Sequence, residues 1–247
     1  MNKFYIKTFL TFLFLLANLY SQQNNTLLQK ESVISENIIL VGNYFPTKGE
    51  KKLFFVLLHG LGSGKEEWSK LETILEKEGW GYFAFDLRGH NESVKTTDEK
   101  TITYNNFTSV EWKKMVSDLD NVIKYLKNKS INEEYIVLVG ASLGANISML
   151  YSAKNKKIKT LILLSPGWNY ANLEPQKILK DISRKNIFIA ASPQDYYSYS
   201  SCRQFIKTLT SYGAKPFFVE GKGTQHGIEM FKKDFLEKIS SWIKTIY

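Results

Sequence analysis

Cysteine is nearly absent from this 247-residue chain, which contains only Cys202. A single cysteine cannot form an internal disulfide and cannot supply a cysteine-based zinc site. Histidine is scarce too: His59, His90 and His226 are the only three, and they lie far apart in the sequence. Three dispersed histidines argue against a catalytic metal site. We therefore expect neither a metal nor an organic cofactor.

The apolar run near the start of the chain is shorter than the ~20 residues that cross a bilayer. It covers residues 9–19, follows Lys3 and Lys7, and precedes the small residue Ser21. This pattern predicts a secretory signal peptide over residues 1–21, with export to the periplasm or medium and no stable membrane span after cleavage. A chain without disulfides fits a bacterial periplasm or medium. An uncleaved anchor is the alternative.

The chain also lacks a concentrated basic module, an internal repeat and a low-complexity linker. Lysine and arginine number 33 against 24 aspartates and glutamates, a formal net charge of +9. The lysines are scattered, for example four of them between residues 154 and 159, which is typical of a solvated face. We therefore expect no nucleic-acid partner. With no linker to divide it, residues 22–247 are predicted to form a single domain.

The most informative stretch is residues 135–146, which read YIVLVGASLGAN. A buried strand is predicted to run into Gly140, Ser142 and Gly144 of a G-x-S-x-G motif, and an apolar helix follows at once. Such a sharp turn strains the backbone of its central residue and needs small residues two positions before and after it. The hydroxyl is then exposed beside the free N–H groups of a helix N-terminus. This context predicts a nucleophilic serine rather than an idle serine in a glycine-rich loop.

Apolar runs alternate with amphipathic segments over the rest of the chain. The predicted strands are residues 38–45, 53–58, 82–85, 135–141, 160–164, 186–191 and 216–220. The predicted helices are residues 65–77, 111–127, the segment from the turn at Ser142 to residue 153, 200–212 and 228–246. Ser63 and Glu66 suggest a capping box for the first helix, which Gly79 closes. The alternation predicts a mostly parallel central sheet flanked by helices on both faces. Ligands bind such sheets at the carboxyl ends of the strands.

A serine hydroxyl needs a base within hydrogen-bond reach, and histidine is suited to this task at neutral pH. His226 lies in a glycine-rich loop, residues 221–227, after the last predicted strand. A loop at that edge can bring its imidazole over Ser142. His59 and His90 are interpreted as residues that fix their own loops. We therefore predict that His226 is the general base.

The base needs a carboxylate to orient it. Asp195 follows a predicted strand end, which makes the chain order serine, aspartate, histidine. Glu220 remains an alternative acid, although it lies only a few residues before His226. Asp86 is interpreted instead as a brace for Arg88 and its loop.

Attack on a carbonyl also requires donors for the developing oxyanion. The predicted donors are two backbone N–H groups, one from Leu61 in the HGLG stretch at 59–62 and one from Leu143 at the start of the helix. At both positions the local backbone matters more than the side chain.

Five segments together resemble the α/β-hydrolase superfamily over nearly all of residues 22–247: HGLG at 59–62, DLRGH at 86–90, GASLG at 140–144, Asp195, and QHG at 225–227. The resemblance implies an α/β-hydrolase fold with an eight-stranded, mostly parallel sheet, and a triad of Ser142, Asp195 and His226. The chain looks most like small lidless serine esterases and the serine-bearing relatives of dienelactone hydrolases. Dienelactone hydrolases proper use cysteine as the nucleophile, so Ser142 favours ester chemistry.

Two features depart from that pattern. The segment before residue 53 is short, so the usual first strands are expected to be trimmed. Asn91 stands where many relatives have glycine.

The expected function is hydrolysis of a small-molecule carboxylic ester by two-step acyl transfer. About twenty residues separate the strands that end at Leu164 and begin at Asn186, which leaves room for only a minimal cap and favours short or exposed esters. Trp168 and Tyr196 are predicted to line the substrate pocket. Amide- or peptide-bond hydrolysis and a catalytically silent binding domain are the alternatives.

Overall fold

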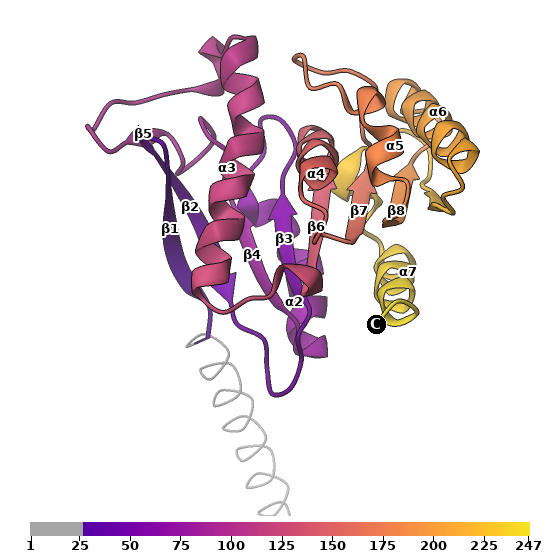
Figure 1. Ribbon diagram of the computed structural model, residues 1–247, viewed down its shortest axis with the longest axis horizontal. Helices are drawn as coiled ribbons and strands as arrows, with labels where there is room; N and C mark the ends of the chain where they lie inside the picture. Colours follow the sequence, from indigo (N-terminus) through magenta and orange to yellow (C-terminus); the bar gives the residue numbers. More distant parts are fainter. Residues whose placement is uncertain (1–26) are drawn as a thin grey trace, which may run out of the picture.

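The predicted apolar runs become strands of one sheet in the computed structural model, which describes residues 27–247. Eight strands follow the order β1-β2-β4-β3-β6-β7-β8-β9, and the short strand β5 pairs with β2 beside this path. Their bounds are β1 Gln29–Ser35, β2 Ile38–Phe45, β3 Phe54–Leu58, β4 Gly81–Phe85, β5 Lys95–Thr96, β6 Ile136–Ala141, β7 Thr160–Leu164, β8 Asn186–Ala191 and β9 Phe217–Glu220. All pairings from β4 to β9 are parallel, which confirms the mostly parallel sheet (Figure 1). The predicted signal peptide, residues 1–21, lies outside the described residues.

The first strands are not trimmed, contrary to expectation. Strand β1 pairs antiparallel with β2 from Gln29↔Tyr44 to Ser35↔Ile38, and β2 in turn pairs antiparallel with β4. Strand β1 reads QKESVIS, and only its Val33 and Ser35 are buried. A polar edge strand of this kind has no continuous apolar run, so periodicity did not reveal it.

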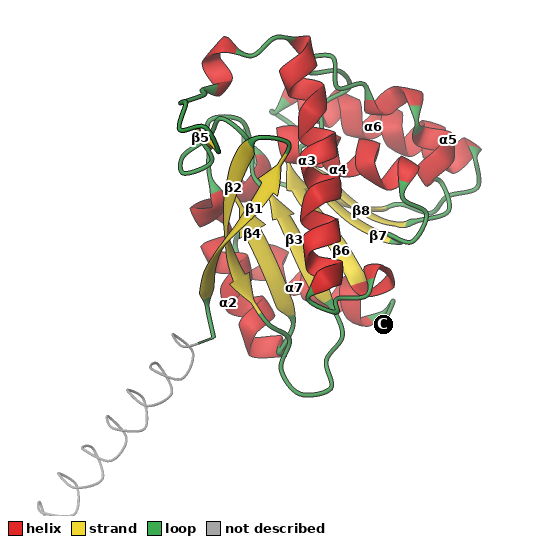
Figure 2. Cartoon of the chain, turned by 60° about the vertical axis from the view of Figure 1, so that its left-hand side comes forward, coloured by secondary structure: helices red, strands yellow, loops and turns green. Residues whose placement is uncertain are grey.

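Helices cover both faces of the sheet (Figure 2). One face carries α3 (Ser109–Asn128), α4 (Leu143–Lys154), α5 (Leu179–Ile182) and α6 (Tyr196–Ser211), and the other carries α2 (Ser69–Glu78) and α7 (Lys233–Lys244). Each face has its own buried apolar cluster. The central strands β3, β6 and β7 are buried along their whole length because they contribute side chains to both clusters.

Three predicted helix starts differ from the structure by more than two residues. The last helix, α7, begins at residue 233, five residues later than predicted. The first helix opens as a 3₁₀ turn, η1 (Lys65–Trp68), before α2 begins at Ser69. The predicted capping box is wrong: the N-cap is Gly64 without a side-chain cap, and Glu66 instead forms an ion pair with Lys65. Gly79 does close α2, with a φ of 75°. Helix α6 begins at residue 196, four residues earlier than predicted, directly after Asp195.

The connection from β7 to β8 forms only a minimal cap, as expected. It contains the 3₁₀ turn η4 (Pro175–Lys177) and the single-turn helix α5. The carboxyl edge of the sheet is therefore not covered by a separate lid domain within the described residues. None of the helices between residues 27 and 247 combines the length and the apolar character that a bilayer span requires.

Candidate active site

Ser142 sits at the apex of the predicted strand–turn–helix, between β6 and α4. Its backbone angles are φ 51° and ψ −111°, a region that costs about 1–3 kcal/mol and persists only where packing enforces it. The neighbouring glycines show why the turn needs small residues. A Cβ on Gly140 would collide with the backbone of Gly144, and a Cβ on Gly144 would collide with the carbonyl oxygen of Leu58. The helix therefore approaches the central strands closely and holds the serine above them.

Asp195 and His226 come together at the same edge of the sheet. Asp195 is the N-cap of α6, after β8, and His226 precedes the 3₁₀ turn η5 (Gly227–Met230), after β9. His226 Nδ1 lies 2.7 Å from Asp195 Oδ2. Because the carboxylate accepts, Nδ1 carries the proton and Nε2 is left as the basic nitrogen. The carboxylate side chain is only 14% exposed against 45% for the imidazole, so the acid lies beneath the base.

The alternative acid, Glu220, does not contact the imidazole. Its Oε2 accepts a hydrogen bond of 2.7 Å from the hydroxyl of Tyr199. The side chain is exposed at the end of β9. Asp195 is therefore the carboxylate in position to orient His226.

A cavity of about 380 Å³ joins the serine to the histidine. Its lining includes Ser142, His226, Leu61, Glu67 and Ile228. No direct hydrogen bond connects the Ser142 hydroxyl with the imidazole within the described residues. Such contacts commonly tighten only in the substrate complex. A small ester placed in this cavity would contact both side chains.

The predicted oxyanion donors lie at this cavity. Leu143 is the first residue of α4, so its N–H has no intrahelical acceptor. Leu61 lines the cavity and is 40% exposed, and its N–H makes no hydrogen bond inside the described part of the chain. The preceding N–H, that of Gly60, is occupied by Glu67 Oε1 at 3.2 Å. The loop thus anchors one N–H and leaves the next one free for a ligand.

His59 and His90 fix their loops, as predicted. The Nε2 atom of His59 accepts from the N–H of Leu87 at 2.9 Å, and its Nδ1 donates to the carbonyl of Gly60 at 2.6 Å. Burial lowers the pKa of His59 to about 4, so the ring is neutral at pH 7. His90 donates to a carbonyl through Nδ1 and stacks on Tyr104. His59 therefore supports the glycine loop at 59–62, His90 supports the loop after β4, and neither ring is placed as the general base.

Asp86 braces the loop after β4, as predicted, because its Oδ2 accepts from the N–H of Glu92 at 3.2 Å, but it does not pair with Arg88. This buried carboxylate accepts from the Nζ of Lys65 at 2.9 Å and from its backbone N–H at 2.8 Å. Arg88 pairs instead with Asp118 on α3, at 2.5 Å. Burial alone would lower the pKa of Lys65, but hydrogen bonds to Asp86 and two glutamates outweigh it and hold the pKa above its usual value. The pair ties the loop after β3 to the loop after β4.

Asn91 lies in that second loop with a φ of 39°. This left-handed region favours glycine and also tolerates asparagine. The departure from the family pattern therefore keeps the backbone conformation that a glycine would allow.

The sequence did not single out two residues near the histidine. Ser165, after β7, accepts a hydrogen bond of 2.9 Å from the N–H of Gly227 and so anchors the histidine loop. Ser198, one turn into α6, places its hydroxyl 3.5 Å from His226 Nδ1. The only available signal was their position just beyond the carboxyl ends of β7 and β8.

The two predicted substrate contacts lie elsewhere on this edge. Trp168 stacks on Phe205 of α6 with ring centroids 5.1 Å apart, and its backbone N–H bonds to Ser201. Tyr196 is 77% exposed in the first turn of α6. Neither residue lines the cavity beside Ser142. Their part in substrate binding stays a prediction.

Comparison with known proteins places this geometry in a family. The alpha/beta hydrolase fold profile matches residues 54–198, more than half of the chain. The chain belongs to the α/β-hydrolase fold family. The matched region contains the HGLG loop at 59–62, the strand–turn–helix around Ser142, and Asp195. The same fold continues beyond it through β9 and α7.

Two curated relatives have hydrolase names. A protein of Mycoplasma genitalium named esterase/lipase 2 is 30% identical over 150 residues, covering 60% of this chain and 51% of the relative. Protein phosphatase methylesterase 1 of Candida albicans is 30% identical over 159 residues, covering 64% of this chain and 39% of the relative. This chain thus spans about half the length, or less, of these relatives.

Solved structures share the fold at low sequence identity. An esterase from Pyrococcus furiosus superposes with a TM-score of 0.70 at 17% identity, covering 88% of this chain and 90% of that one. Est1E from Butyrivibrio proteoclasticus, solved with ferulic acid, gives a TM-score of 0.66 at 17% identity, covering 87% and 99%. At this identity the likeness concerns the fold alone.

Proposed function

We propose that this protein is a serine hydrolase that cleaves small carboxylic esters through an acyl-enzyme. The observation that carries the proposal is the 2.7 Å bond between Asp195 and His226 beside a cavity that Ser142 also lines. The esterase names of the relatives support ester bonds as the substrate class.

The reaction proceeds in two steps. The Ser142 hydroxyl attacks the ester carbonyl carbon while His226 Nε2 takes its proton, and Asp195 stabilises the resulting imidazolium. The N–H groups of Leu61 and Leu143 stabilise the tetrahedral oxyanion. The imidazolium then protonates the leaving alkoxide. Water, deprotonated by the same imidazole, releases the acid and regenerates the serine.

The size and openness of the site favour short acyl groups. A cavity of about 380 Å³ lies at the lower end of the range for small-molecule sites. The minimal cap between β7 and β8 provides no enclosure for a long chain. We therefore expect acetyl and butyryl esters to react faster than long-chain esters.

A panel of p-nitrophenyl esters of graded acyl length tests this function on the purified chain. We expect turnover of the short esters and a loss of about 10⁴-fold or more in kcat for Ser142→Ala, because the nucleophile is gone. Ser200→Ala, on the exposed face of α6, is the matched control and should retain full activity. An active Ser142→Ala variant would contradict the proposal.

The same panel separates the two alternative functions. If the protein hydrolyses peptide bonds, it should release p-nitroaniline from aminoacyl p-nitroanilides at rates comparable to those of ester hydrolysis. A silent binding domain predicts a folded protein that turns over neither class. Ester turnover that greatly exceeds anilide turnover would select the proposed function.

A further inference from the structure

The end of the sheet at which the parallel strands begin, opposite Ser142, carries a concentration of positive charge. The connection from α4 to β7 and the segment from α5 to β8 meet there, where the parallel strands begin. We define the basic edge by seven residues of these segments: Lys154, Lys156, Lys157, Lys159, Lys180, Arg184 and Lys185. Lys185 Nζ donates to the carbonyl oxygens of Asn155 and Ile158, so the two segments are fastened together.

Three adjoining hollows, of about 690, 550 and 840 Å³, run along the basic edge and share lining residues. Nine cationic and three acidic side chains line them together. Lys154, Lys180 and Arg184 are exposed and form no ion pair with any acidic residue between 27 and 247. The whole chain has an excess of nine positive charges, so most of that excess lies on this one edge.

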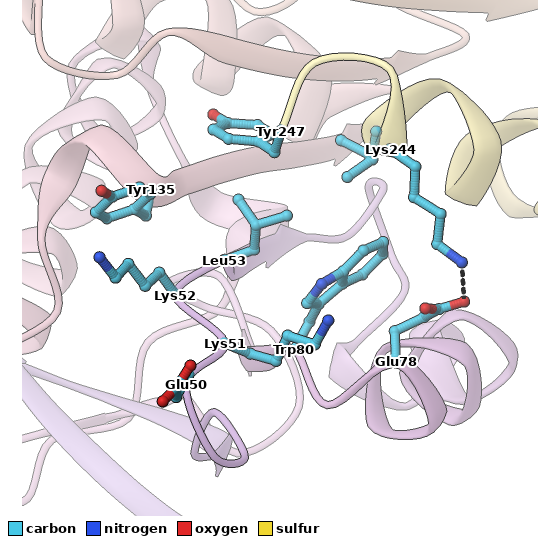
Figure 3. A pocket seen from close by; sticks show the side chains of 10 residues that line it. Glu50, Lys51, Lys52, Leu53, Glu78, Trp80, Tyr135, Lys244 and Tyr247 are labelled. Atoms are coloured by element: carbon cyan, nitrogen blue, oxygen red, sulfur yellow. Dashed lines mark hydrogen bonds and ion pairs between the residues drawn. The ribbon is translucent and has the colours of Figure 1, made fainter.

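An aromatic hollow of about 540 Å³ lies at the same edge, near the start of β3 and the end of α7 (Figure 3). Trp80, Tyr135 and Tyr247 line it together with lysines. The Nζ of Lys52 lies 5.5 Å from the centre of the Tyr135 ring, and Lys244 pairs with Glu78 at 2.6 Å. Trp80 is buried, but Tyr247 is 48% exposed, and a tyrosine beside lysines is typical of a membrane–water interface.

The chain enters the described structure at this edge too. Strand β1 starts at Gln29 opposite Tyr44, at the end of β2 that pairs with the beginning of β4 (Figure 1). Ser142 lies at the other end of the strands, so a partner bound at the basic edge would leave the catalytic cavity open.

We propose that the basic edge binds the surface of an anionic lipid bilayer. Each lysine or arginine near such a surface is attracted to anionic headgroups, and the attraction falls off within a Debye length. Tyrosines beside lysines occur at membrane–water interfaces, which is why we assign a lipid surface to this edge; binding to a nucleic acid instead is an outcome that the test distinguishes.

Co-sedimentation of the purified full chain with vesicles tests the proposal. Vesicles of phosphatidylcholine alone are compared with vesicles that contain 30% phosphatidylglycerol. We expect at least tenfold tighter binding to the anionic vesicles, weakened by added salt. The triple variant Lys154→Glu, Lys180→Glu, Arg184→Glu should lose this preference, because the three exposed cations have no acidic partners.

The matched control reverses three exposed lysines at helix starts near the catalytic edge: Lys70→Glu, Lys113→Glu and Lys232→Glu. It has the same net charge as the first variant and should keep the preference for anionic vesicles. Equal loss in both variants would mean that only net charge matters, and would overturn the proposal. Equal binding to both vesicle types, or capture by heparin or DNA but not by vesicles, would overturn it as well. Thermal unfolding verifies that all variants are folded.

Discussion

At the scale of single residues, the site depends on which carboxylate orients the imidazole. The chain order made Asp195 the preferred acid and left Glu220 open. The structure separates them because helix α6 begins directly after Asp195, which fixes the carboxylate beneath His226, whereas Glu220 is engaged by Tyr199. This difference in contacts leads to a direct comparison of two substitutions.

Asp195→Asn should lower kcat for p-nitrophenyl acetate by about 10³–10⁴-fold, because the amide no longer stabilises the imidazolium or its correct tautomer. Glu220→Gln should lower it less than threefold. The measurement is steady-state kinetics of both variants at pH 7.5. A collapse of turnover in Glu220→Gln alone would reverse the assignment.

Ser165→Ala should weaken the histidine loop without touching the triad. The change leaves the buried N–H of Gly227 without an acceptor, which costs about 1–3 kcal/mol. We expect a drop of about tenfold in kcat, together with a lower midpoint of urea unfolding. Ser200→Ala serves again as control. Unchanged kinetics in Ser165→Ala would show that the loop holds its position without this bond.

At the scale of elements, the predictable parts are those with a continuous or regular apolar pattern. Strands β7 and β8 match the predicted ranges because β7 is buried from end to end and β8 is buried everywhere except at its first residue, Asn186. Strand β1 was missed because its pattern is polar. The ion pairs of Lys65 with Asp86 and of Arg88 with Asp118 were not predictable, since they join segments that only the fold brings together.

Lys65→Met should destabilise the protein by about 3–5 kcal/mol, because it leaves the buried carboxylate of Asp86 without its cationic partner. Lys244→Met removes a more exposed pair with Glu78 and should cost less than about 1 kcal/mol. Urea unfolding of both variants at pH 7 provides the two values. Similar losses in the two variants would contradict the structural role of the buried pair.

At the scale of the whole molecule, the mostly parallel sheet, its helices on both faces and the meeting of three distant segments at one edge followed from alternation and motif spacing. The details of substrate contact did not follow. Trp168 and Tyr196 were chosen because aromatics follow two strand ends, yet packing on Phe205 and the early start of α6 place them away from the cavity. Sequence position identifies an edge, but not the direction of each side chain.

Stability should fall as the pH drops from about 6.5 to about 4. The folded chain holds His59 neutral with a pKa of about 4, whereas the unfolded chain protonates it near its ordinary value of 6.5. In that window the unfolded state binds more protons, so the free energy of unfolding decreases by up to ~3 kcal/mol and then levels off. His59→Gln can keep one donor and one acceptor. In urea titrations between pH 7.5 and 4 this variant should lose less stability than the wild type; identical pH dependences would contradict the assignment.

The central claim is that His226 and Asp195 make the hydroxyl of Ser142 nucleophilic. Reaction with a fluorophosphonate, followed by peptide mass spectrometry, tests it most directly. We predict a single stoichiometric adduct on Ser142, absent from Ser142→Ala and at least a hundredfold slower in His226→Ala. A folded wild type that does not react, or an adduct that persists in Ser142→Ala, would contradict the account.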